Sequence, residues 1–260
     1  MTTIIKAELF RLLRRRTVVL AAMGAVVFAA VATLTVFSSA EETGRPSRTG
    51  GTTLAALADN GTEVFAVGAS FVGFLVFVTF IALFAGEFSG GTFRALSLRE
   101  PHRLRLIVGK LTGVLLVAAG VVALAELCTF LLSLAVAPGQ DVSTANWFTL
   151  DGLFAGLGDY GTVMTGVTGW AIFGTTLAVI FRSAPIALGV GFAWAGPFEN
   201  IVVDSWDTGF RVFPGQVLGS LIRGGTVELG MGRAILTAGA YTGLAAIASL
   251  VLITRRDVTA

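Results

Sequence analysis

The chain has 260 residues, of which 55% are apolar and 13% are Asp, Glu, Lys or Arg; a soluble domain usually has about 25% of these charged residues. The mean hydropathy of +0.85 excludes a disordered chain and disfavours a water-soluble globule, so the sequence predicts a membrane protein. The single cysteine and the single histidine exclude an intramolecular disulfide and any metal site that needs two or more His or Cys ligands.

Residues 4–16 combine apolar and basic side chains at helical spacing. The apolar positions are Ile5, Leu9, Leu12 and Leu13, and the basic positions on another face are Lys6, Arg11 and Arg14. This pattern predicts an amphipathic helix at the membrane interface, where arginines meet anionic lipid headgroups. The basic residues at 14–16 also fit a signal peptide, but the apolar run after them exceeds the usual length of about 7–15 residues. We therefore interpret that run as the first membrane span.

Six stretches of the sequence are long and apolar enough to cross a membrane, which takes about 20 residues. They are residues 17–37, 64–85, 111–137, 161–181, 184–203 and 234–253. Only Arg182 and Ser183 separate the fourth stretch from the fifth, and Pro185 follows, so these two spans are expected to form a tight helical hairpin. The predicted fold is an all-α membrane protein with one transmembrane domain over residues 1–260.

The distribution of basic residues predicts the orientation of the spans. An even number of spans places both termini on the same side of the membrane. If that side is the cytoplasm, the inner segments hold 13 of the 18 basic residues, namely Lys6, Arg11, Arg14, Arg15, Arg16, Arg94, Arg99, Arg103, Arg105, Lys110, Arg182, Arg255 and Arg256. Lys and Arg gather on the cytoplasmic side of membrane proteins. Both termini and the loop 87–110 are therefore predicted to be cytoplasmic.

The loop 87–110 is predicted to contain a short helix between Gly91 and Arg99, because helix-forming residues fill that stretch and Pro101 then ends it. The alternative is a solvated basic loop that only sets the topology. Three large apolar side chains count against this alternative, namely Phe93, Leu96 and Leu98. Large apolar side chains are unfavourable in a solvated loop, whereas they are suited to a groove on a partner.

The string Glu87-x-x-x-Gly91-Thr92-x-Arg94, followed by Arg103 and then Gly109-Lys110, resembles the cytoplasmic signature of type-2 ATP-binding-cassette exporter permeases. The bacterial antibiotic-immunity and multidrug permeases are the most similar group in size. The resemblance covers the chain in outline, from the amphipathic N-terminal helix to the final 256–258. His102 departs from the pattern, since a small Ser is usual there, and the segment 101–110 is about one residue short.

In such permeases the loop after the second span is similar to a coupling helix that docks on a separate ATPase subunit. The resemblance assigns coupling roles to Glu87, Gly91, Thr92, Arg94 and Arg103. Gly91 lets the backbone turn out of the membrane, Thr92 can cap the helix, and Arg94 can bind a carboxylate or helix-end carbonyls on the partner. Glu87 is expected to pair with Arg94 or with the N-terminal basic helix. Phe93 and Leu96, three residues apart, are the expected apolar anchors.

The chain contains no phosphate-binding loop of the form G-x-x-x-x-G-K-[ST], so ATP and Mg²⁺ are expected on the partner ATPase, and this chain is expected to bind no cofactor and no nucleic acid. The resemblance also implies a second permease copy, surrounding lipid and the bacterial plasma membrane. One alternative is an immunity or sensor factor that uses the same coupling without transport. An intramembrane enzyme is a further alternative, but no H-E-x-x-H or G-x-S-x-G motif supports it.

Glu126 lies 16 residues beyond Lys110, about 24 Å along the third span at 1.5 Å per residue. A carboxyl group at that depth is expected to face protein or water, or to be protonated. The two interpretations are a substrate-path or proton-relay group and a structural hydrogen bond to a Thr of a neighbouring span. Trp170 lies near the middle of the fourth span and is the other candidate for a substrate path, although tryptophans there are more often packing groups. The segment 210–225 is too short to span, and it is expected to dip into the outer leaflet as a broken amphipathic helix.

Overall fold

The computed structural model describes residues 1–40, 52–100, 102–206 and 208–255, which form helices and no strands. Six of these helices are long and apolar enough to span a membrane. The predicted all-α fold with six spans is therefore confirmed. Pro101, Arg45, Arg48 and the final 256–258 lie outside the described residues.

The six long helices coincide with the six predicted stretches and extend beyond most of their ends. They are α2 (Arg15–Ser39), α4 (Glu63–Ser89), α6 (Arg103–Val136), α7 (Leu150–Phe181), the composite span Ala184–Ser205, and α12 (Met231–Arg255). The largest difference is at α7, which begins at Leu150 instead of near residue 161. The polar residues Asp151 and Asp159 interrupt the hydropathy there, although the helix continues through them.

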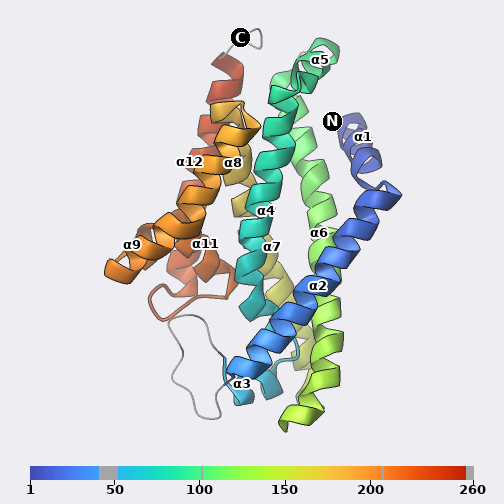
Figure 1. The fold of residues 1–260 in the computed structure, drawn as a ribbon, viewed down its shortest axis with the longest axis vertical. Helices are drawn as coiled ribbons and strands as arrows, with labels where there is room; N and C mark the ends of the chain where they lie inside the picture. The colour runs from blue at the N-terminus through green and yellow to red at the C-terminus, as the bar shows by residue number, and fades with distance from the viewer. Residues whose placement is uncertain (41–51, 101, 207, 256–260) are drawn as a thin grey trace.

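Shorter helices precede the first span or lie between the spans. They are α1 (Thr2–Leu12), α3 (Leu54–Asp59), α5 (Thr92–Arg99), the 3₁₀ turns η1 (Ala137–Gln140) and η2 (Ala145–Phe148), α10 (Gly209–Val212) and α11 (Pro214–Ile222). Both chain ends and α5 lie at one end of the bundle, whereas α3 and the end of α6 lie at the other (Figure 1). We call these the α5 end and the α3 end. The two termini lie at the same end of the bundle, as an even number of spans requires.

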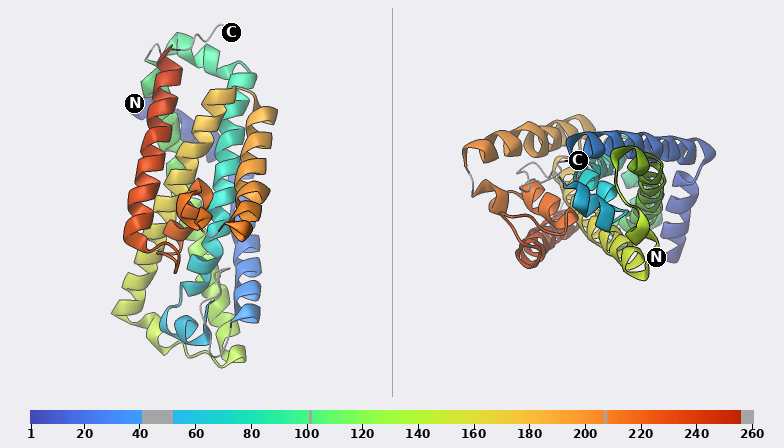
Figure 2. Two further views of the ribbon diagram at one scale, coloured as in Figure 1. Left: turned by 90° about the vertical axis from the view of Figure 1, so that its left-hand side faces the viewer. Right: turned by 90° about the horizontal axis from the view of Figure 1, so that it is seen from below.

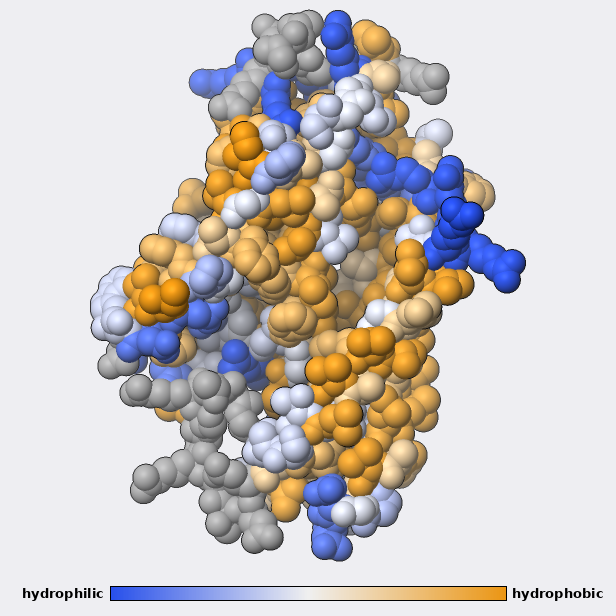
Figure 3. Space-filling view, viewed as in Figure 1, coloured by the Kyte–Doolittle hydropathy of each residue, from blue (hydrophilic) through white to orange (hydrophobic). Residues whose placement is uncertain are grey.

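Helices α4 and α7 form the centre of the bundle, and their mutual contact is the most extensive between any two elements. Seen from the α3 end, α4 lies between α2 and α6 on one side and residues 184–255 on the other (Figure 2). Phe80 and Ile81 of α4 and Val163 and Val167 of α7 are fully buried there. Apolar side chains cover much of the face between hydrophilic ends in Figure 3, as expected for a protein surrounded by lipid.

Close approach between α4 and α7 depends on Gly174. A Cβ atom at Gly174 would lie 2.8 Å from the backbone oxygen of Phe77 and 3.1 Å from the Cβ of Phe80. We expect Gly174→Ala to lower the free energy of unfolding by about 1–3 kcal/mol, because the added methyl group overpacks the helix contact. Unfolding of the purified protein in increasing denaturant measures this loss. Gly161→Ala on the same helix faces open space and should leave the stability nearly unchanged; an equal loss in both variants would contradict the packing explanation.

The fifth span is a single continuous element with a wide turn in its middle. It consists of α8 (Ala184–Ala193), the π-helical turn η3 (Trp194–Phe198) and α9 (Glu199–Ser205). The π turn contains Pro197. Proline has no N–H to continue the ordinary helical hydrogen bonds, and this accounts for the wide turn at this point. At the other end, Arg182 takes the left-handed conformation, with φ of 50°, and closes the predicted hairpin between α7 and α8.

The segment 210–225 forms the short helices α10 and α11, packed between the spans. Glu199 is buried and accepts hydrogen bonds from the backbone N–H groups of Gly215 and Gln216, both at 3.2 Å. These are N–H groups of the first turn of α11, which has no earlier helical carbonyls to bind. On the opposite side, Leu218 of α11 fits against Gly169 of α7, where a Cβ atom would lie 2.5 Å from the leucine side chain.

Candidate functional site

A cluster of four charged side chains, three of them buried and Arg11 38% exposed, joins three helices near the α5 end. Lys110 of α6 donates hydrogen bonds to Glu8 of α1 at 2.9 Å and to Glu87 of α4 at 2.8 Å. Arg11 of α1 donates to Glu87 at 2.6 Å and also pairs with Glu8. Glu8, Glu87 and Lys110 are each less than 8% exposed. We call these four residues the ion cluster.

Two glycines of α6 allow α1 to approach closely enough to form the ion cluster. A Cβ atom at Gly113 would lie 2.9 Å from the Cβ of Glu8, and one at Gly109 would lie 3.0 Å from Ile4. Helix α1 thus packs on α6. It ends at Leu12, earlier than the predicted residue 16, and Arg15 begins α2.

Glu87 is predicted to pair with Arg94 or with the N-terminal basic helix. In the structure it accepts a hydrogen bond from Arg11 of that helix. The sequence did not identify Glu8 as a member of the site. The sequence does contain an indication of its role, because Glu8 is the only acidic residue among the basic residues of segment 1–16.

Helix α5 begins directly after Gly91, whose φ of 70° is the left-handed conformation that glycine adopts without strain. Gly91 therefore makes the expected turn out of α4. The prediction that Thr92 caps the helix is wrong: Thr92 is the first helical residue, Gly91 holds the cap position, and no side chain caps this end.

The side chain of Phe93 points into the chain. It is 5% exposed, its ring lies 4.5 Å from that of Phe88, and it packs in a cluster of buried residues from several helices. The other buried members are Leu106, Ile107, Val179 and Ile253, and Leu96 packs against them. The expectation that Phe93 fills a groove on a partner is therefore wrong, because its ring is already buried in this chain. Leu96, which is partly buried against the same cluster, is also directed inward.

The outer face of α5 carries Arg94, Ala95 and Leu98, all exposed, with Leu98 84% exposed. Arg94 forms no ion pair with any residue that the structure describes. Arg103, by contrast, donates a hydrogen bond to the backbone oxygen of Ile253 at 3.3 Å. Its positive charge lies at the C-terminal end of α12, where the helix dipole is negative. Glu87 and Arg103, the other charged residues with a predicted coupling role, bind groups within this chain. The exposed guanidinium of Arg94 is thus available to bind a partner protein.

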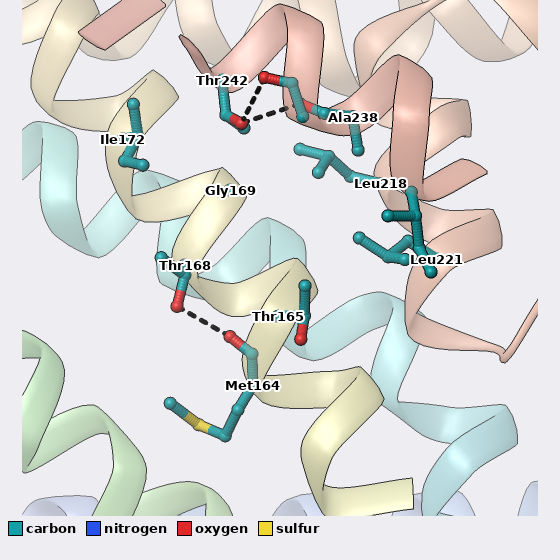
Figure 4. Close-up of a pocket in the computed structure, with 11 residues that line it drawn as sticks. Met164, Thr165, Thr168, Gly169, Ile172, Leu218, Leu221, Ala238 and Thr242 are labelled. Atoms are coloured by element: carbon teal, nitrogen blue, oxygen red, sulfur yellow. Dashed lines mark hydrogen bonds between the residues drawn. The ribbon is translucent and has the colours of Figure 1, made fainter. Parts of the chain in front are cut away.

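An apolar cavity of about 480 Å³ lies between α7, α11 and α12 (Figure 4). Its walls include three threonines, Thr165, Thr168 and Thr242, which all donate their hydroxyl hydrogens to backbone oxygens of their own helices. The cavity therefore offers no free hydroxyl hydrogen. It is suited to an apolar group.

A second cavity, of about 490 Å³, lies between α6 and α7 and includes Glu126 in its lining. The other predicted path residue, Trp170, lines neither of these two cavities. Its ring is buried 4.9 Å from that of Phe77, against Gly73 of α4. Trp170 therefore contributes to helix packing.

In the described part of the chain, no group of acidic, His or Cys side chains is able to hold a metal ion.

Comparison with known proteins identifies one family. The model of the family described as "ABC-2 family transporter protein" matches residues 4–194, which include α1, α5, the ion cluster and the first four spans. No curated protein matches the chain at a significant level.

Proposed function

Because this chain belongs to the ABC-2 family of transporter proteins, whose members are the membrane permeases of ABC transporters, we propose that it exports a substrate using ATP hydrolysed by a separate ATP-binding-cassette subunit. The exporter lies in the bacterial plasma membrane with α5 and both termini in the cytoplasm. ATP and Mg²⁺ bind to the partner, and a second copy of this chain completes the transport path.

The observation that carries this proposal is the placement of α5. The helix protrudes at the end of the bundle that holds both termini (Figure 1), with Arg94 and Leu98 on its exposed face. A guanidinium without a partner beside an exposed apolar side chain is a composition found at protein interfaces. This face therefore supports docking of an ATPase subunit.

Movement of α5 would reach the spans through its buried face. Phe93 contacts the cluster that includes Ile107 of α6, Val179 of α7 and Ile253 of α12. Closely packed side chains transmit displacement because the interior has little free volume. A push on α5 by the ATPase pair would thus tilt several spans together as a rigid body.

Purification of the tagged chain from its native membrane tests the proposal directly. We expect an ATP-binding-cassette ATPase to co-purify, and we expect ATP to drive substrate into inverted membrane vesicles that contain both subunits. ATPase stimulation without substrate movement would favour the sensor alternative instead. Failure of any ATPase to co-purify with the wild-type chain would overturn the proposal.

The orientation of the chain can be measured with single cysteines in a Cys128→Ala background, since Cys128 is the only cysteine. Ala95 on α5 and Ser143 between η1 and η2 are both exposed. We expect an impermeant thiol reagent added to intact cells to label Ser143→Cys and not Ala95→Cys, because the basic residues gather on the cytoplasmic side. Both positions should react after the cells are opened, and labelling of position 95 alone on intact cells would refute the orientation.

A further inference from the structure

The cavity between α6 and α7 combines one carboxylate with aromatic and apolar walls. Its lining comes from α6, from η2, from Thr149 and the first turns of α7, and from Thr62 at the start of α4. Phe130, Trp147 and Phe148 provide three aromatic rings, with Phe130 centred 5.8 Å from Trp147 and 6.0 Å from Phe148. The indole N–H of Trp147 donates to the backbone oxygen of Leu57 at 2.9 Å, so this wall is held in place.

Glu126 is the acidic residue that lines this cavity, and no residue that the structure describes pairs with its carboxyl group. It is half-buried and forms no hydrogen bond or ion pair with the residues that the structure describes. The neighbouring Asp159 differs, because it accepts hydrogen bonds from Asn60 at 2.9 Å and from Thr62 at 2.6 Å. A carboxyl group inside a span is costly to ionise unless it meets a compensating group. The cavity therefore presents a carboxyl group to which no described residue supplies a positive charge or a hydrogen bond.

The charge and the rings occupy opposite ends of the cavity. Helices α6 and α7 are antiparallel, and Glu126 precedes Phe130 on α6 by four residues, about 6 Å along the axis. Gly156 of α7 faces the carboxylate, and a Cβ atom there would lie 3.8 Å from Oε1 of Glu126. The end of the cavity farther from η2 thus contains the carboxyl group of Glu126, and the end next to η2 contains Trp147 and Phe148.

The walls between these ends are apolar and partly open. Leu150, Leu153 and Leu157 of α7 line the cavity and are each 59% exposed or more. A bare metal ion would need several oxygen ligands, and the lining provides one carboxylate. An acyl chain alone would leave the carboxylate against hydrocarbon. A bulky cation with apolar or aromatic substituents satisfies both ends, through charge pairing and through contact with the rings.

We propose that the cavity between α6 and α7 binds an amphipathic organic cation, with its positive centre beside Glu126 and its aromatic or apolar groups against Phe130, Trp147 and Phe148. This inference deepens the proposed function by naming the substrate class of the permease. Binding itself does not require the ATPase.

Equilibrium binding of tetraphenylphosphonium to the full-length chain in phosphatidylcholine nanodiscs tests the proposal, after subtraction of binding to empty nanodiscs. Tetraphenylborate has the same shape and the opposite charge, so it is the matched control ligand. We expect saturable binding of the cation, no saturable binding of the anion, and about a tenfold weaker affinity for the cation in Glu126→Gln, because the amide keeps the shape and loses the charge. Asp151→Asn, an exposed neighbour that does not line the cavity, should bind the cation as the wild type does.

Phe148→Ala provides a second variant in case Glu126→Gln does not fold, since Phe148 is 69% exposed and its removal leaves the core intact. It should weaken cation binding severalfold through the lost ring contact. Equal binding of the two ions to the wild type, or wild-type affinity in both variants, would overturn the proposal. These outcomes are independent of the ATPase, so a permease that binds the cation but recruits no ATPase would refute only the proposed coupling.

Discussion

Arg94→Glu is expected to leave the permease folded in the membrane and to weaken its association with the ATPase by about 30-fold or more. Arg94 is exposed and unpaired in the described residues, so the substitution removes no contact within the chain. At an interface, loss of a central arginine commonly costs about 2 kcal/mol, and charge reversal adds repulsion from the partner's acidic group. Titration of the ATPase onto nanodiscs that contain the permease measures the affinity and the stimulation of ATP hydrolysis together.

Arg233→Glu is the matched control for charge, because Arg233 is also exposed but lies at the start of α12, far along the chain from α5. It should retain wild-type affinity. Leu98→Ala, on the exposed face of α5, is expected to weaken association as well. Full ATPase binding and full stimulation in both Arg94→Glu and Leu98→Ala would eliminate the exposed face of α5 as the docking surface.

Phe93→Ala should behave differently from Arg94→Glu, because the ring belongs to the permease core. Truncation of a buried phenylalanine costs about 3–5 kcal/mol of folding free energy through lost burial and a residual cavity. The variant is therefore expected to show lower thermal stability of the purified chain. A stable Phe93→Ala protein that has lost only ATPase binding would show that the ring contacts the partner.

The second large effect is expected at the ion cluster. Lys110→Met should lower the free energy of unfolding by about 3–5 kcal/mol, because Glu8 and Glu87 would remain buried without the ammonium group between them. Thermal or denaturant unfolding of the purified permease measures the loss. Lys6→Met on the exposed side of α1 is the matched control and should change the stability little.

A triple variant separates the contribution of charge from that of shape. Glu8→Gln and Glu87→Gln remove both buried negative charges, so their addition to Lys110→Met should restore part of the lost stability. If Lys110→Met alone unfolds at the wild-type temperature, the buried ion cluster does not hold α1, α4 and α6 together.

The sequence by itself determined the membrane class, the six spans and the presence of a helix at residues 92–99. These features depend on local properties: the length of an apolar run, the conformational freedom of Gly91 and the helix-forming residues after it. Local hydropathy was less informative at the start of α7, where Asp151 and Asp159 interrupt the apolar pattern of a helix that begins at Leu150.

Only the tertiary structure decided which side of each helix meets another helix. Phe93 and Arg94 are adjacent in the sequence, yet one is buried against α6, α7 and α12 and the other is exposed. Likewise, Lys110 meets Glu8 across 102 positions of sequence, and Glu199 holds the first turn of α11. Such contacts depend on how distant segments approach one another, and a helical repeat specifies faces without specifying what covers them.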